Sequence, residues 1–328
     1  MNTRNKALAI GGGVAAVALI GWFALSSMAT NRAEDALYGF LDEYGIRQNV
    51  QWRDLSASPF GKVKIDDVSV NVMGKVIATI DKVEIDDFTS DQKRKRISLQ
   101  ASKIADADGY SLLSDWDYLA ATGARQQPPA SLKVKWDFDL RDNDGTLELG
   151  MNQPGAMEGE IKLELENTGV LNNFSQLITE SRGTPNFFGA SIWQLAMMGA
   201  LEATGSIRVR SAEARLKDDG YVKRSLALSQ RYLQPVSIDE KDPSKARKKE
   251  FEKRLDENLA ACREEASTTF RSINKGAASC KAFSEFLGGK SSSLKLTSKP
   301  ARPVSLSMLM ENSRSPEQLL LLLQPQLD

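Results

Sequence analysis

Apolar and charged side chains alternate without a break between Leu132 and Leu140. Successive side chains of a β-strand point to opposite faces of a sheet, so this alternation predicts a strand with one apolar and one charged face. The face that we expect to be buried consists of Leu132, Val134, Trp136, Phe138 and Leu140. The residues that should face water are Lys133, Lys135, Asp137 and Asp139.

The same alternation returns after two short turn sequences. Asp144-Gly145 precedes the alternating residues up to Met151, and Pro154-Gly155 precedes those up to Leu165. Because such turns join neighbouring antiparallel strands, the pattern predicts an antiparallel meander with one face exposed to solvent. Upstream, residues 62–68 and 82–88 are similar alternating segments, and each changes phase at an Asp-Asp pair. One extra residue at each pair, a β-bulge, would explain the change.

Helical spacing of apolar residues predicts the remaining elements. Helices are expected at 33–44, within 170–204, at 221–232, at 243–273, at about 280–287 and at 317–323. The long charged helix from residue 243 and its successor should form a helical hairpin over about 243–287. Further strands are expected at 97–101, 207–216, 294–296 and 304–308.

No charged residue lies between Lys6 and Arg32. About 20 apolar residues suffice to cross a bilayer core, so this segment predicts one transmembrane helix at residues 7–29. Arg4 and Lys6 precede it, which predicts a cytoplasmic tail at 1–6 and an exported, periplasmic domain at 30–328. The alternative is a signal peptide cleaved after Ala29, because Ser27-Met28-Ala29 fits a small-x-small cleavage site. Both interpretations export the domain.

The composition argues against several classes of function. Lys and Arg together number 43, as do Asp and Glu, so no basic excess is available for nucleic acid. The chain has no histidine and only two cysteines, which removes the usual general base and the commonest metal ligands. The sequence therefore predicts no catalytic, cofactor-binding or metal-binding residues, and a protein that is not an enzyme.

The two cysteines, Cys262 and Cys280, lie on the apolar stripes of two consecutive predicted helices. A turn at 274–277 would fold these helices back on each other and bring the stripes together. Because an exported domain meets oxidants, we expect an intramolecular disulfide. The alternative is a pair of buried free thiols that act as small apolar residues.

The hydrophobic N-terminal segment, the element at 60–70 (FGKVKIDDVSV) and its echo at 82–88 resemble the start of AsmA-like and YdgA-like bacterial envelope proteins. The pattern around Ala212 to Arg224, which contains the sequence ARLKDDGYVKR, and the closing section at 294–323 are similar to that broad group as well. The resemblance implies a periplasmic domain of long curved β-sheets with an apolar groove, and a role in lipid traffic or envelope maintenance.

The expected fold is α+β: a transmembrane helix, then a periplasmic domain in which helices cover a curved antiparallel meander. The expected protein spans the bacterial inner membrane once, with its N-terminus in the cytoplasm. Its expected function is envelope maintenance, with lipid bound on the apolar sheet face. The alternative is a non-enzymatic interaction module that scaffolds another envelope protein. Neither interpretation includes nucleic acid or a cofactor.

Overall fold

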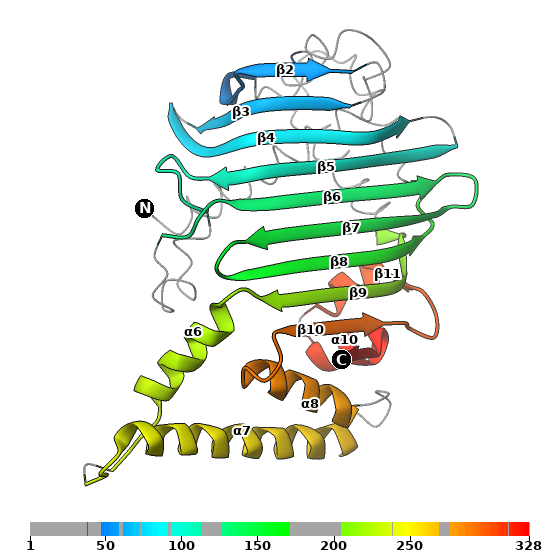
Figure 1. Cartoon of the computed structure of the whole chain (residues 1–328). Coiled ribbons are helices and arrows are strands. Elements are labelled where there is room, and N and C mark those ends of the chain that lie inside the picture. Colours follow the sequence, from blue (N-terminus) through cyan, green and yellow to red (C-terminus); the bar gives the residue numbers. More distant parts are fainter. Residues whose placement is uncertain are drawn as a thin grey trace.

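The structure is a computed structural model, and it describes Tyr38 and residues 47–58, 62–72, 74–90, 93–112, 126–170, 205–237, 239–268, 276–313 and 315–327. The described residues form one twelve-stranded antiparallel sheet in the order β1-β3-β4-β5-β6-β7-β8-β9-β10-β12. β2 also pairs with β3, and β11 pairs with β9. Strands β3 to β10 therefore lie side by side in chain order (Figure 1).

The strands are β1 (Val50–Gln51), β2 (Asp54–Ala57), β3 (Val63–Val72), β4 (Lys75–Ser90), β5 (Arg94–Ala105), β6 (Ala130–Asp139), β7 (Asp144–Gln153), β8 (Met157–Glu166), β9 (Arg208–Asp218), β10 (Ser293–Ser298), β11 (Val304–Ser305) and β12 (Pro325–Leu327). The alternating segment from Leu132 forms β6, which pairs with β5 on one side and β7 on the other. Asn143 (φ 56°) and Gly155 (φ 72°) provide the left-handed residues in the turns before and after β7. The predicted meander is therefore present.

The two Asp-Asp pairs change the phase of their strands in different ways. At Asp86-Asp87 the register with β5 shifts by one residue, which is the predicted bulge. At Asp67 (φ 51°) the pairing with β4 keeps its register, although the buried positions switch from odd to even numbers. The neighbouring strands change phase at the same level, at Asp81 and Lys103, and these two residues form an ion pair of 2.9 Å.

The core lies on one face of the sheet and has two main parts. The larger part, formed by β3, β4 and β5, is nearly dry, since Ile65, Ile85 and Leu99 are each at most 2% exposed. The smaller part surrounds Phe138, near the C-terminal end of β6, and includes Leu165 of β8. The ring of Phe138 lies over Gly145 on the facing strand, where a Cβ would collide with it.

The helices are α6 (Tyr221–Leu228), α7 (Pro243–Thr268), α8 (Gly276–Leu287), α9 (Leu306–Glu311) and α10 (Pro316–Leu323), with one π-helical turn at Ser229–Leu233. Figure 1 shows α7 and α8 beyond β10, outside the edge of the sheet, and α6 leading from the end of β9 toward α7. α7 packs on α8 and on the π-helical turn, and α8 contacts β10 and β12. Of the described helices, α9 contributes Leu306 and Leu309 to the cluster around Phe138.

The predicted fold class, an α+β domain with a transmembrane helix and a sheet covered by helices, is wrong. The described residues are mostly one antiparallel sheet with few helices. The longest helix, α7, does not cover the sheet, because it presents only a narrow half-buried stripe and packs on α8. No helix among the described residues combines the length and apolar character needed to cross a membrane. The predicted span at 7–29 and the helices at 33–44 and 170–204 lie outside the described residues.

Smaller predictions have mixed outcomes. The helix expected at 317–323 is α10, and the strand expected at 294–296 is part of β10. The strand expected at 304–308 is wrong after Ser305, because that residue caps a helix: its hydroxyl accepts a hydrogen bond from the amide of Met308 (3.2 Å).

The uneven burial of the apolar face predicts unequal effects of truncation. Ile85→Ala removes a side chain from the dry core, so it should lower the free energy of unfolding by about 2–5 kcal/mol. Ile161→Ala, on the same face at a position that is 44% exposed, should lower it by about 1 kcal/mol or less. Urea unfolding of the two variants provides the comparison, and equal losses would contradict the burial pattern.

Candidate functional site

An apolar row crosses the sheet from β6 to β12. Cross-strand pairing places six residues in register: Val134, Leu149, Ile161, Ala214, Leu296 and Leu327. Directly paired residues point to the same face of a sheet, so these side chains form one continuous line, called the apolar row below. The strand spacing of about 4.8 Å gives the row a length of about 24 Å.

The middle of this row is open, unlike the rest of the apolar face. Leu149 is 36% exposed and Ile161 is 44% exposed, and Met151 beside them is 36% exposed. The core around β3 to β5 covers one flank of this region, and the cluster around Phe138 covers one end of the same strands. Large apolar side chains therefore meet solvent at the point where β7 and β8 cross the row.

The row ends in a pocket of about 250 Å³ beside the helices of the sheet edge. Its lining comes from α7, α8, β10, α10 and β12, and includes Ala266, Cys280, Phe283, Leu296, Leu320 and Leu327. Two members of the apolar row, Leu296 and Leu327, are thus also walls of the pocket. Ser279 lines it too, but its hydroxyl accepts a hydrogen bond from the amide of Leu327 (2.9 Å).

A disulfide between Cys262 of α7 and Cys280 of α8 forms part of the pocket wall. The two Cα atoms lie 5.9 Å apart, within the usual range for such bonds. Close by, a Cβ added to Gly276 would stand only 3.0 Å from the Cβ of Ala266, so the two helices approach closely here. The bond and this contact fix α7 against α8.

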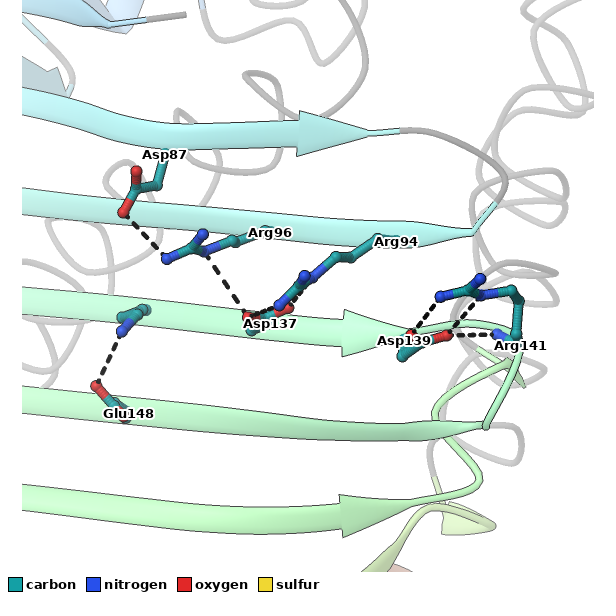
Figure 2. Close-up of polar contacts among 8 residues, drawn as sticks. Asp87, Arg94, Arg96, Asp137, Asp139, Arg141 and Glu148 are labelled. Carbon is teal, nitrogen blue, oxygen red and sulfur yellow. Dashed lines mark hydrogen bonds and ion pairs between the residues drawn. The ribbon is translucent and has the colours of Figure 1, made fainter.

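The opposite face of the sheet carries cross-strand ion pairs (Figure 2). Arg94 donates two hydrogen bonds to Asp137, of 2.7 and 2.6 Å, and Arg96 lies between Asp137 and Asp87. The hydrogen bond from Arg94 is the main reason that the pKa of Asp137 is lowered. Nearer the turn, hydrogen bonds from Arg141 lower the pKa of Asp139 to about 2. This face is therefore a hydrated, internally paired surface.

The predicted apolar residues of β6 do share one face, but their environments differ. Phe138 is buried, whereas Leu132, Val134, Trp136 and Leu140 are half-buried. Leu132 and Trp136 pack against the core of β3 to β5, and Trp136 and Leu140 also contact the cluster around Phe138. Of the charged residues, Lys133 is exposed and the other three are partly shielded by their ion pairs.

Sequence reasoning placed Leu149 and Ile161 on the apolar face but did not identify them as its exposed part, and it missed the pocket. Alternation assigns a face, yet exposure depends on which distant segment covers that face. The pocket brings together residues from five elements between Cys262 and Leu327. No local sequence pattern predicts that these residues come together, although the expected cysteine pair lies at the position of the pocket.

Within the described ranges, no group of three or more cysteine or acidic side chains could hold a metal ion. Neither a scan against protein-family models nor a search of curated proteins finds a match for this chain. The resemblance to AsmA-like and YdgA-like proteins therefore stays an expectation from the sequence.

Asp137 should make stability depend on pH. Its pKa is lower in the folded chain than in the unfolded one, so its contribution is present above the unfolded value near 4 and is lost as the pH falls through the folded value. Because the pair is accessible to solvent, Asp137→Asn should cost no more than about 1 kcal/mol at neutral pH, a fall in Tm of about 2–4 °C. Thermal unfolding of both proteins should show this difference shrinking at acid pH.

Glu257→Gln is the control for that experiment, since Glu257 forms an exposed pair with Lys253 within helix α7. It should change the Tm little at either pH. A Tm difference for Asp137→Asn that stays constant from acid to neutral pH would contradict the role given to its carboxylate.

The disulfide should contribute about 3 kcal/mol to stability, because its two ends are 18 residues apart and the bond restricts the unfolded chain. Replacing it with Cys262→Ser and Cys280→Ala should lower the free energy of unfolding by that amount. Intact mass after denaturation with a thiol-blocking reagent should show no alkylation until the protein is reduced. Uptake of two alkyl groups without reduction would contradict the bond.

Proposed function

We propose that this chain is an exported protein of the bacterial cell envelope that binds an acyl chain of a lipid along the apolar row. The observation that carries the proposal is the open middle of the row, where Leu149, Met151 and Ile161 present large apolar side chains to solvent. Exposed apolar surface that continues into an apolar pocket is typical of a binding site.

The dimensions of the row support an acyl chain as the occupant. From Leu149 on β7 to Leu327 on β12 the row crosses four strand spacings, about 19 Å. A bilayer core is about 30 Å thick, so an acyl chain in one leaflet extends over about 15 Å. The row from Leu149 to Leu327 is therefore long enough for one chain laid across the strands.

The chemistry of the two faces supports the same occupant. The row has no charged member, so an acyl chain bound there makes apolar contacts and leaves no charge unpaired. The opposite face is occupied by its own ion pairs, such as Arg94 with Asp137 and Lys135 with Glu148. Binding on one face therefore leaves the other hydrated.

Two further observations support an envelope location. Disulfides persist in oxidising compartments such as the periplasm. The two cysteines of the sequence form one disulfide. The uncharged sequence between Lys6 and Arg32 is suited to a membrane and would keep the domain near its lipid. The resemblance noted from the sequence agrees with this role.

The test is photo-crosslinking of the full chain in its membrane with a fatty acid that carries a photoreactive group on its acyl chain. Wild type should be labelled on β7 and β8. Ile161→Asp puts a carboxylate against the bound chain, at a cost of about 1–3 kcal/mol, so labelling should fall about tenfold or more. The fold should tolerate this change because Ile161 is 44% exposed.

Lys162→Asp is the matched control, since it introduces the same residue on the same strand but on the opposite face. Its labelling should equal that of wild type. If wild type is not labelled on the row, the proposal fails, and the face is left for a protein partner of an envelope complex, the interaction module that the sequence also allows.

A further inference from the structure

The pocket at the end of the apolar row is too small for a whole lipid. Its volume is about 250 Å³, whereas pockets that enclose a complete small ligand measure about 300–1,000 Å³. It is nevertheless larger than an apolar cavity of about 150 Å³ that binds benzene. A segment of hydrocarbon is therefore the size of object that it holds.

The lining of the pocket is suited to hydrocarbon. Phe283, Leu320 and Leu327 supply carbon surface, and the hydroxyl of Ser279 is already bonded to the backbone of β12. Glu265 is the charged member of the lining, and it is exposed. A polar ligand segment would find few partners inside, whereas methylene and methyl groups lose only contact with water.

The pocket also lies where a chain on the apolar row would arrive. Leu296 pairs with Ala214 in the row and lines the pocket, and Leu327 pairs with Leu296 and lines it as well. A chain that follows the row from Ile161 therefore reaches the pocket one strand beyond Ala214.

We propose that this pocket is the terminal subsite for the acyl chain, and that it sets the longest chain that the protein binds well. The inference rests on the proposed function of the apolar row and adds the end of the site to it. The disulfide and the close contact of Ala266 with Gly276 hold the far wall, so the pocket cannot easily deepen. Each added methylene strengthens binding until the pocket is full, and further methylenes add nothing.

The test uses saturated fatty acids of increasing chain length as competitors against the photoreactive fatty acid, with the full chain in its membrane. Wild type should show affinity that rises severalfold with each added pair of carbons and then reaches a plateau. Phe283→Asp places a carboxylate in the pocket lining at a side chain that is already 46% exposed, so the fold should tolerate it. This variant should bind short chains as wild type does and lose the gain for long ones.

Leu287→Asp is the matched control: the same new residue on the same helix, at a side chain that is 43% exposed and outside the pocket lining. It should keep the wild-type dependence on chain length. If Phe283→Asp also keeps that dependence while Ile161→Asp abolishes labelling, the subsite is wrong and the apolar row stands. If wild type is not labelled at all, the proposed function fails and the subsite fails with it.

Discussion

A sheet with one apolar face must have that face covered, and this requirement governs the rest of the structure. Along β3 to β5 the cover is complete, and residues such as Ile85 and Leu99 are almost inaccessible to solvent. Along β7 and β8 it is not, since Leu149 and Ile161 are 36% and 44% exposed. Water that contacts Leu149 and Ile161 can be displaced with a gain in free energy, and that gain is the physical basis of the proposed binding site.

The opposite face of the sheet is covered by charged side chains, and its two edges are protected against further strand pairing. On that face, acidic and basic side chains form cross-strand pairs such as Arg94 with Asp137 and Lys135 with Glu148, so it is hydrated and many of its charges are paired (Figure 2). Such pairs add little stability individually, but they make this face a poor surface for apolar ligands. At one edge β1 and β2 are short, and at the other Ser279 of α8 bonds the amide of Leu327 on β12. Both devices discourage further strands from adding to the sheet.

Sequence patterns predicted local structure well where one strand contained the whole signal. The alternation around Val134 located β6, and turn residues such as Gly155 located its neighbours. The phase change at Asp67 was visible, but its matching changes at Asp81 and Lys103 depend on three strands together. The helical cover was wrong for a similar reason: the hairpin of α7 and α8 was predicted from the sequence, but the sequence does not show that the hairpin packs at the edge of the sheet and leaves its face uncovered.

The exposed part of the row and the pocket also depend on contacts between distant segments, so neither could be predicted from a local pattern. The disulfide contributes to the pocket through its effect on α7. α7 is charged on most of its surface and its apolar residues are only half-buried, so burial alone holds it weakly. The bond from Cys262 to Cys280 removes that freedom at the position where α7 forms the pocket wall. Disulfides persist in oxidising compartments, and the proposed lipid site requires lipid nearby. Both features agree with the proposed location in the cell envelope.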